Sequence, residues 1–449
     1  MTHSQHTLPA KTPSLFDELT WRDLVYDATE GLSDLFARQS VTVYAGFDPT
    51  ASSLHVGHML PLMGLARMQR AGHIPIAVVG GGTGMIGDPS GKSQERNLLS
   101  MEQIDEHVAS IRPQLQHFLD FERAGNAARI VNNADWLGTV GLLDFLRDAG
   151  KHFTVNYMLQ KESVHRRLES EEGISFTEFS YLLLQSYDFL QLFDRYGCTL
   201  QIGGSDQWGN ITAGIDLIRK LRAAKAHGLV MPLVMTASGV KFGKTEAGTV
   251  WLDPARTSPF AFYQFWLNTD DRDVVRYLKS FTFLSRDTVT ELEVTAQRAP
   301  ETRDAQRMLA REITTLVHGT EQVARAEHAS RVLFGEDIAQ LPADDVLAIF
   351  ADVPAAEVSS ALLGGEGLPI VDLAVLARLA PSKSEARRLV QGGGVYVNNR
   401  KIADIQARIG LDLAIGGRVF VVRKGARQNH LVKIVQQGLD GANLVRNTP

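Results

Sequence analysis

Cysteine is almost absent from this sequence: Cys198 is the only one among 449 residues. A single thiol excludes a disulfide within the chain and a zinc site built from cysteines. No run of about 18 apolar residues is present, which argues against a membrane-spanning helix. Residues 1–14 lack both the apolar stretch of a secretory signal and the arginines of a transit peptide, so we expect a cytoplasmic protein.

Acidic residues are scarce near the C-terminus. Residues 369–449 contain 13 Lys and Arg but only five Asp and Glu, a net charge of +8, whereas the preceding residues carry a net charge of −13. This division suggests a small basic module for nucleic acid attached to an acidic body. The alternative is a basic tail that is merely solvated.

The length of the chain exceeds one typical hydrophobic core, so we expect two or three domains. Strand-like and helical segments alternate through the first half, which predicts an α/β fold with a doubly wound parallel, Rossmann-like sheet. From about residue 258 the pattern is mostly helical, and a small α+β pattern ends the chain. The expected parts are a Rossmann-like domain, a loop with a helical domain, a linker rich in Ala, Ser, Gly and Pro, and a basic α+β domain, at 1–235, 236–350, 351–368 and 369–449.

Four segments of the first half have the pattern of strands, at 41–47, 74–80, 128–134 and 198–204. Helices are expected at 56–71, 101–119, 176–196 and 210–224. Doubly wound sheets bind ligands at the carboxyl ends of their strands. The segments after the first, second and fourth strands are therefore the candidates for a binding site.

The first strand runs into a helix whose opening turn carries His55 and His58. Their spacing of three residues places both on one helical face. Two imidazoles at a helix N-terminus can donate to phosphate where the helix dipole favours anions, which fits a nucleotide transition state. Gly57 between them would let an adenine ring lie against bare backbone. The alternative is a metal half-site, but no third ligand follows at a recognisable spacing.

Two loops carry basic residues beside glycine. Lys241 and Lys244 flank Gly243, as a mobile clamp on a polyanion would require. The other loop, at 80–92, is rich in glycine but differs from a P-loop, because only three residues separate its glycine from the Gly-Lys pair instead of four.

The glycine-rich loop has other features that suit a ligand site. Its closely spaced glycines would let backbone N–H groups approach a ligand. Asp88 offers a fixed negative charge, and Lys92 and Arg96 offer positive ones. The alternative is a plain turn with surface charges.

The segment 176–196 is apolar nearly all round, which predicts a buried helix. Tyr181, Gln185 and Asp188 nevertheless form one polar stripe along it, at i, i+4 and i+7. Buried polar groups need partners, and a zwitterionic or hydroxylated small ligand could supply them. An internal hydrogen-bond network is the alternative.

These motifs resemble those of the bacterial-type tyrosyl-tRNA synthetases, which are class I aminoacyl-tRNA synthetases. His-Val-Gly-His at 55–58 resembles the His-Ile-Gly-His signature of the class, and Lys-Phe-Gly-Lys-Thr at 241–245 resembles its Lys-Met-Ser-Lys-Ser loop. YAGFDPTASSLHVGH, GDPSGK, SYLLLQSYDFL and QIGGSDQWGNI resemble segments of the tyrosine enzyme, in the same order. The resemblance spans nearly the whole chain, including a C-terminal module similar to one in a ribosomal small-subunit protein.

The resemblance implies a tyrosine–tRNA ligase. Such an enzyme uses ATP as a substrate to convert L-tyrosine to tyrosyl-adenylate and pyrophosphate, then transfers tyrosine to the 3′-terminal adenosine of tRNA(Tyr). Mg²⁺ would accompany the ATP phosphates without a dedicated protein metal site. The family also implies a homodimer, with neither membrane nor DNA as a partner.

The resemblance also assigns roles to residues. Tyr44 and Asp188 would bind the phenol of the substrate. The residues implied to hold tyrosine are Tyr44, Asp88, Tyr181, Gln185, Asp188 and Gln207. Those implied to bind ATP are Gly46, Asp48, Thr50, His55, Gly57, His58, Gly204, Asp206 and Lys244. The implied catalytic residues, which orient the phosphates and stabilise their charge, are His55, His58, Lys92, Arg96, Lys241, Lys244 and Thr245.

The sequence departs from the class pattern at three places. Phe242 and Gly243 replace the Met and Ser of the signature, so the loop loses a hydroxyl. Pro61, early in the first helix, is expected to kink it or to remove a donor near ATP.

Three alternative functions remain open at this point. A tryptophanyl enzyme would have no use for Tyr44 and Asp188 aimed at a phenol. A metabolite adenylyltransferase would leave the basic C-terminal module and the loop around Lys241 unexplained. A non-catalytic RNA-binding protein on a synthetase scaffold would be expected to lose the histidines or lysines, and all are present.

Overall fold

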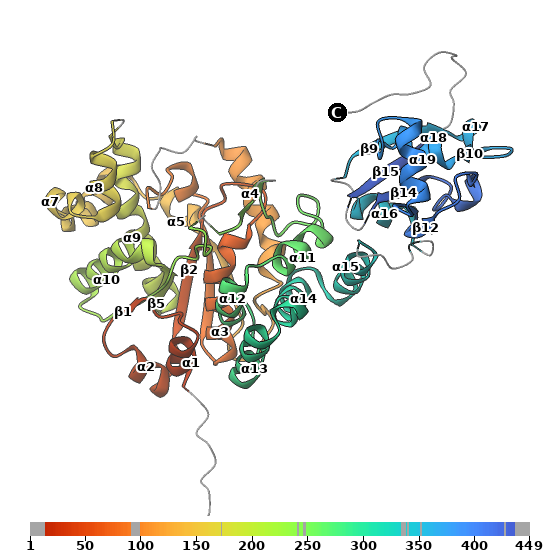
Figure 1. Ribbon diagram of the computed structural model, residues 1–449. Coiled ribbons are helices and arrows are strands. Elements are labelled where there is room, and N and C mark those ends of the chain that lie inside the picture. Colours follow the sequence, from red (N-terminus) through yellow and green to blue (C-terminus); the bar gives the residue numbers. More distant parts are fainter. Residues whose placement is uncertain are drawn as a thin grey trace, which may run out of the picture. The chain divides into compact units, whose positions relative to one another are not determined.

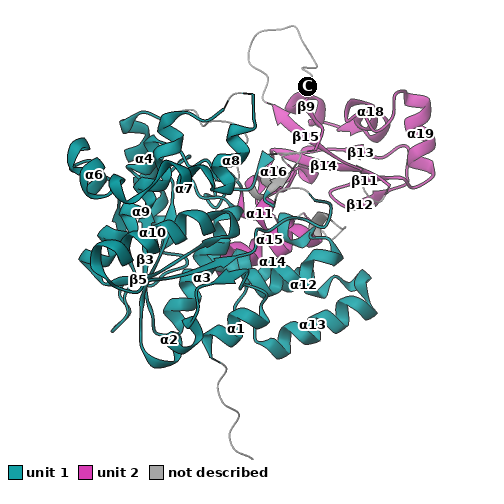
Figure 2. Ribbon diagram, turned by 90° about the vertical axis from the view of Figure 1, so that its left-hand side faces the viewer, with its two compact units in different colours: residues 1–257, 265–317 teal, residues 258–264, 318–449 magenta. Residues whose placement is uncertain are grey.

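The computed structural model describes residues 14–90, 99–171, 173–239, 242–245, 248–333, 338, 341–350, 353–425 and 428–435. The chain forms two compact units (Figure 2). Unit 1 comprises 1–257 with 265–317, and unit 2 comprises 258–264 with 318–449. Among the described residues, no helix has the length and apolar character needed to cross a membrane.

Unit 1 is built on a six-stranded sheet in the order β1-β6-β5-β2-β3-β4 (Figure 1). All neighbouring pairs are parallel except the short edge strand β1, which pairs antiparallel with β6. The strands are β1 (Asp27–Ala28), β2 (Thr42–Phe47), β3 (Ile74–Val79), β4 (Arg129–Asn132), β5 (Cys198–Gly204) and β6 (His227–Met231). A hairpin of β7 (Lys244–Thr245) and β8 (Gly248–Thr249) forms a separate small sheet.

Helices cover both faces of the six-stranded sheet. Gly64 of α3 faces Ile202 of β5 at a distance that leaves little room for a side chain, whereas Tyr44 of β2 packs against Phe189 of α9. Tyr44 pairs with Gln201 of β5 and points to the same face as it does. Successive residues of a strand point to opposite faces, so Ile202 points to the other face, and α3 and α9 lie on opposite sides of the sheet. The doubly wound α/β fold predicted from the sequence is therefore confirmed.

The described helices span a wide range of lengths, and α9 coincides with the predicted segment 176–196. They are α1 (Leu15–Trp21), α2 (Leu32–Arg38), α3 (Met59–Arg70), α4 (Met101–Leu115), α5 (Ala134–Leu137), α6 (Leu142–Asp148), α7 (Val155–Leu159), α8 (Glu162–Leu168), α9 (Phe176–Tyr196), α10 (Trp208–Arg222), α11 (Pro259–Leu267), α12 (Asp271–Phe281), α13 (Arg286–Arg298), α14 (Asp304–His318), α15 (Thr320–Leu333), α16 (Ala343–Ile349), α17 (Ser360–Leu363), α18 (Ile370–Leu376) and α19 (Lys383–Gln391).

Pro61 does not interrupt the first helix after the sheet. Helix α3 begins at Met59 and continues to Arg70, so Pro61 stands in its first turn. Backbone N–H groups in a first turn have no partner within the helix, and proline is tolerated there because its missing N–H costs no helical hydrogen bond. The expected kink is therefore absent.

Unit 2 contains a five-stranded sheet in the order β12-β11-β14-β15-β9, with a two-stranded pair of β10 and β13. Its strands are β9 (Ala355–Ser359), β10 (Leu368–Pro369), β11 (Val395–Val397), β12 (Arg400–Ile402), β13 (Arg408–Ile409), β14 (Val419–Lys424) and β15 (Gln428–Val435).

The residues expected to form a linker, 351–368, include strand β9, which pairs in parallel with β15. Helix α16, which precedes it, packs with Val419 and Val421 of β14 in one apolar cluster. Ala, Ser, Gly and Pro gave this segment the composition of a linker, but its partner strand lies more than 70 residues further along the chain, where composition cannot reveal it. Unit 2 therefore starts well before residue 369.

Candidate active site

The site lies where β2 and β5 separate. β2 pairs with β3 along its whole length, from Thr42 to Phe47, but its pairing with β5 ends at Tyr44, opposite Gln201. The strand order also reverses here, because β3 and β4 extend to one side of β2 and β5 and β6 to the other. Such a switch point forms a ligand crevice at the carboxyl ends of the strands. Gly46, on β2 at this opening, has open space where a side chain would stand.

Tyr44 on β2 and Asp188 on α9 are both buried side chains. Tyr44 is 2% exposed and Asp188 is 4% exposed. The Tyr44 hydroxyl and the Gln201 Oε1 atom are buried and find no hydrogen-bond partner among the described residues. Unpaired buried polar atoms are costly, so two of them on adjacent strands make this place a candidate binding site. Burial, followed by the nearby Asp188 charge, raises the pKa of Tyr44 well above its usual value, so its hydroxyl stays neutral.

The Asp188 carboxylate is held by two residues that sequence reasoning missed. Trp136 Nε1 donates to Oδ1 at 2.6 Å, and Asn133 Nδ2 donates to Oδ2 at 2.9 Å. Burial raises the pKa of Asp188 to about 7, although these two hydrogen bonds oppose the shift. The carboxylate is therefore fixed in orientation and titrates near neutral pH.

A second carboxylate, Asp48, lies directly after β2 and is joined to the same network. Thr83 Oγ1 donates to Asp48 Oδ1 at 2.8 Å, and the Tyr181 hydroxyl donates to Oδ2 at 3.1 Å. Asn133 Nδ2 also contacts Thr83 Oγ1 at 2.9 Å. The network therefore joins Asp48 to Asp188 and brings residues from the ends of three strands together with α9.

Gln185, on the same polar stripe of α9, belongs to a second network. Gln207 Nε2 donates to Asp88 Oδ2 at 2.8 Å, while Gln185 Nε2 donates to Gln207 Oε1 at 3.3 Å. Asn210, also missed from the sequence, donates to Gln185 Oε1 at 2.8 Å. Gln207 further contacts Asp206, which follows Gly204 at the end of β5. The polar stripe predicted on α9 thus does enter hydrogen-bond networks, and these networks border the crevice.

His55 and His58 lie together at the start of α3, with ring centroids 3.9 Å apart. The Nδ1 atom of His58 accepts from the His55 backbone N–H at 3.1 Å, and Nδ1 of His55 accepts from Gly57 N–H at 3.0 Å. A neutral imidazole that accepts at Nδ1 carries its proton on Nε2. Both rings are thereby fixed in the tautomer whose Nε2–H can donate to a phosphate oxygen.

Gly57 lies directly beneath the ring of His55. A Cβ atom there would lie 2.7 Å from Cε1 of His55, because the ring folds back over the backbone. The adenine contact expected at Gly57 stays a prediction. Thr50, the other predicted ATP contact in this region, is exposed two residues after Asp48.

The glycine-rich loop after β3 is compact for a similar reason. Cβ atoms at Gly80 and Gly81 would lie 2.2 Å from side-chain oxygens of Asp48 and Asn132, respectively. The N–H groups of Gly81 and Gly82 donate to the side-chain oxygens of Asn132 and Asn133 at 3.1 and 2.8 Å. These two N–H groups bind the protein, so the expected contact of the loop backbone with a ligand does not apply to them.

The second signature loop lies against the first. The Gly243 carbonyl accepts from Val250 N–H, and the Val250 carbonyl accepts from Val56 N–H, at 3.1 and 3.0 Å. Gly243 has φ of +82°, and a Cβ there would lie 2.5 Å from Val56 Cγ2. Lys244 and Thr245 form strand β7, and the predicted residues Lys92, Arg96 and Lys241 lie outside the described residues.

The residues missed from the sequence share a weak signal. Thr83, Asn133 and Asn210 are polar residues shortly after the carboxyl ends of parallel strands, and Gln201 is a lone polar residue in a buried strand. The location after a parallel strand could have identified the first three. No local pattern distinguishes Trp136 from an ordinary core residue.

Comparison with known proteins shows the family of this chain. The model of the family described as tRNA synthetases class I (W and Y) matches residues 37–335, and that of the tyrosine–tRNA ligase SYY-like C-terminal domain matches residues 345–432. The tyrosine–tRNA ligase of Roseiflexus castenholzii is 57% identical over 422 residues, covering 94% of this chain and 100% of the relative. That of Geobacillus stearothermophilus is 52% identical over 422 residues, covering 93% and 99%.

Among solved structures, a C-terminally truncated mitochondrial tyrosyl-tRNA synthetase of Aspergillus nidulans superposes with a TM-score of 0.66 at 32% identity. The superposition covers 72% of this chain and 95% of that one. The chain therefore belongs to the class I tRNA synthetases for tryptophan and tyrosine and, within them, to the tyrosine–tRNA ligases.

Proposed function

We propose that this tyrosine–tRNA ligase activates L-tyrosine with ATP in the crevice between β2 and β5 and then transfers it to tRNA(Tyr). The observation that carries the proposal is the unpaired, fully buried Tyr44 hydroxyl beside the Asp188 carboxylate. A phenol entering the slot between these two side chains would accept a hydrogen bond from the Tyr44 hydroxyl and donate one to the Asp188 carboxylate. Phenylalanine would leave both polar groups without this partner, which is costly in a buried site.

The amino-acid end of the substrate would lie near the second network. We assign its ammonium group to Asp88, Tyr181 and Gln185, because this part of the crevice combines a carboxylate with hydrogen-bond acceptors. Asp48, Asp206 and Gln207 would border the substrate and the ribose of ATP. Gly46, Thr50 and Gly204 line the approach to this space from the ends of β2 and β5.

The chemistry requires orientation and stabilisation of charge. The tyrosine carboxylate oxygen attacks the α-phosphorus in line, a new P–O bond forms, and the bond to the bridging oxygen breaks to release pyrophosphate. His55 and His58 would donate Nε2–H to the phosphates at the N-terminus of α3, where the helix dipole also favours negative charge. No protein nucleophile is needed.

The basic residues would stabilise the negative charge on the same phosphates. Lys241 and Lys244 would close over the leaving pyrophosphate, Thr245 would support this loop, and Lys92 with Arg96 would add positive charge. Mg²⁺ would be held mainly by the ATP phosphates, because it keeps several of its waters and usually takes only one or two carboxylates from a protein.

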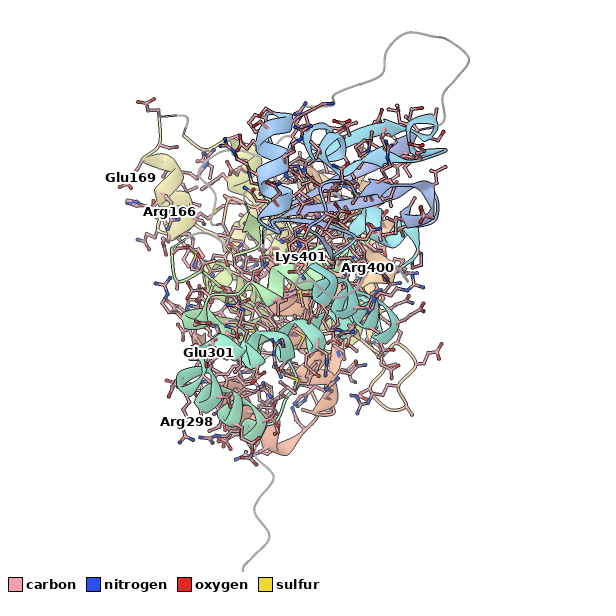
Figure 3. The ribbon with its side chains drawn as sticks, turned by 45° about the vertical axis from the view of Figure 1, so that its right-hand side comes forward. Arg166, Glu169, Arg298, Glu301, Arg400 and Lys401 are labelled. Carbon is pink, nitrogen blue, oxygen red and sulfur yellow. The ribbon has the colours of Figure 1, made fainter. Side chains whose placement is uncertain are left out.

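Binding of tRNA is assigned to the basic C-terminal part together with the helical middle. Residues 369–449 carry a net charge of +8. Arg400 and Lys401 on β12 are exposed to solvent (Figure 3). Reversing both charges should leave tyrosyl-adenylate formation intact, raise the KM for tRNA, and lower the salt dependence of charging.

A homodimer would bury the exposed apolar side chains of helices α6, α7 and α9. Leu143 and Phe176 are each 80% exposed, and Leu142 and Val155 are more than half exposed. Apolar patches of this kind mark protein interfaces. Leu143→Glu should therefore shift the protein to monomer in light scattering, whereas Val294→Glu on α13 should not. We place the enzyme in the cytoplasm, where its tRNA substrate is charged.

The direct test is exchange of labelled pyrophosphate into ATP with magnesium and one amino acid at a time. Tyrosine should support exchange far better than phenylalanine or tryptophan. Equal exchange with all three amino acids, or none with any, would exclude the proposed activity. Faster exchange with tryptophan would instead indicate the other branch of this family.

A further inference from the structure

Helix α12 binds the chain segment that enters the second signature loop. The Asp273 carboxylate accepts from the backbone N–H of Ala237 at 2.8 Å. The guanidinium group of Arg276 donates to the Met235 carbonyl and to Asp273. The stem of the loop is thus attached to the first two turns of α12, within unit 1.

Phe242, inside the loop, is buried against the middle and the end of the same helix. It is 6% exposed, although it lies between two loop lysines in the sequence. Its ring stacks on Phe281 at a centroid distance of 5.2 Å and an angle of 12°, and meets Tyr277 edge-on at 5.0 Å. Trp266 and Phe265 complete the aromatic cluster at 5.6 and 5.7 Å. The Phe that replaces the usual Met is therefore an anchor for the loop.

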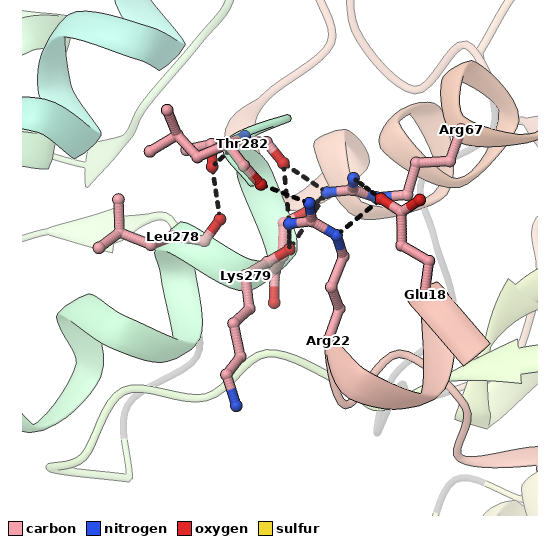
Figure 4. Close-up of polar contacts among 8 residues, drawn as sticks. Glu18, Arg22, Arg67, Leu278, Lys279 and Thr282 are labelled. Atoms are coloured by element: carbon pink, nitrogen blue, oxygen red, sulfur yellow. Dashed lines mark hydrogen bonds and ion pairs between the residues drawn. The ribbon is translucent and has the colours of Figure 1, made fainter. Parts of the chain in front are cut away.

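The C-terminus of α12 is attached to the helix that carries the first signature. Arg67 of α3 donates through Nη2 to the carbonyls of Lys279 and Thr282 at 3.1 and 2.7 Å. Arg22 donates to the same two carbonyls at 3.0 and 3.3 Å, and Glu18 accepts from Arg22 (Figure 4). Both arginines are buried, and the carbonyls at a helix C-terminus attract cations.

Through these contacts α12 connects the two signatures. Helix α3 begins directly after His58. Helix α12 holds Phe242, which stands between Lys241 and Lys244 in the sequence. We propose that Phe242 is a positioning residue, whose ring, held by α12, fixes the backbone of the loop at Lys244 relative to the two histidines. The inference rests on the proposed role of these lysines at the leaving pyrophosphate.

The tyrosine slot should not depend on this anchor. Tyr44 packs against Phe189 of α9 on one face of the sheet, while α12 packs on α3, which covers the opposite face. Loss of the anchor would let the loop occupy many positions, which lowers the fraction with both lysines aligned on the phosphates. The rate of activation should therefore fall without a change in tyrosine affinity.

The test compares Phe242→Ala, Phe242→Met and wild type in single-turnover formation of tyrosyl-adenylate and in tyrosine binding measured by equilibrium dialysis. Phe242→Ala should lower the rate at least tenfold and keep the Kd for tyrosine within twofold. Phe242→Met should regain most of the rate, because a flexible apolar side chain can refill the aromatic cluster. Phe118→Ala, a matched truncation of a buried ring remote from the loop, should lower stability without this loss of rate.

A second variant tests the same inference without opening a cavity. Arg276→Gln removes the contact with the loop stem and should also lower the rate more than the affinity for tyrosine. A wild-type rate in both Phe242→Ala and Arg276→Gln, or a loss of tyrosine affinity equal to the loss of rate, would overturn the positioning role. If wild type forms no tyrosyl-adenylate at all, the proposed function fails instead, so the two failures are distinguishable.

Discussion

The unpaired hydroxyl of Tyr44 makes the variant Tyr44→Phe informative, because stability and substrate binding should change in opposite directions. A buried hydroxyl without a partner costs about 1 to 3 kcal/mol. The Tyr44 hydroxyl finds no partner among the described residues, so its removal should raise the free energy of unfolding by about 1 kcal/mol and the Tm by about 2 °C.

Binding of tyrosine should weaken in the same variant. A neutral hydrogen bond contributes about 0.5 to 1.5 kcal/mol, so the Kd for tyrosine should rise about two- to tenfold. Phenylalanine has no hydroxyl to lose, and its affinity should stay unchanged. Thermal unfolding without ligand and equilibrium dialysis with both amino acids measure these quantities.

Tyr181→Phe is the matched control. The Tyr181 hydroxyl donates to Asp48 at 3.1 Å, so the same chemical change should here lower the free energy of unfolding by about 1 kcal/mol. If Tyr44→Phe is also destabilised and binds tyrosine as tightly as wild type, its hydroxyl has a protein partner and does not face the substrate.

Three further predictions concern other parts of unit 1. The pKa of Asp188 is about 7, and the substrate phenol needs an ionised acceptor. The affinity for tyrosine should therefore rise with pH up to about 7 and then level off. Asp188→Asn should bind tyrosine weakly and without this pH dependence, as measured by equilibrium dialysis at about pH 5.5 to 8.5. Gly243→Ala should reduce pyrophosphate exchange at least tenfold, whereas Gly239→Ala, which has a similar positive φ but open space around it, should reduce exchange far less. Glu178→Gln should destabilise the protein by about 3 to 5 kcal/mol in urea unfolding, because it removes the negative charge from the buried ion pair with Arg167. The same change at Glu162, whose ion pair is exposed, should cost less than about 1 kcal/mol.

The sequence predicted the elements of unit 1 that have a strong local pattern. Helix α9 and strand β5 have the bounds expected from periodicity, since apolar spacing is a property of neighbouring residues. The strand order places the carboxyl ends of β2 and β5 together, so Asp48 and Asp206 lie in the region expected for a ligand. The motifs themselves were sufficient to identify the family.

Long-range pairing was beyond the reach of these patterns. The expected linker contains β9, because its partner strand β15 is remote in sequence. In the same way, the deviation of Phe242 from the signature appeared to be only the loss of a class residue. Its role as an anchor depends on aromatic rings that follow it by more than 20 residues.

The sequence by itself determined which chemical groups this enzyme has: two histidines at a helix start, a polar stripe on a buried helix, and a loop with two lysines. Only the tertiary structure decided which of these groups are paired and which find no partner among the described residues. Asp48 and Tyr181 are 133 residues apart, yet they share a hydrogen bond, while Tyr44 has none among the described residues. The physical reason is that periodicity reports local burial, whereas the pairing of buried polar atoms depends on the order of strands and the packing of helices across them.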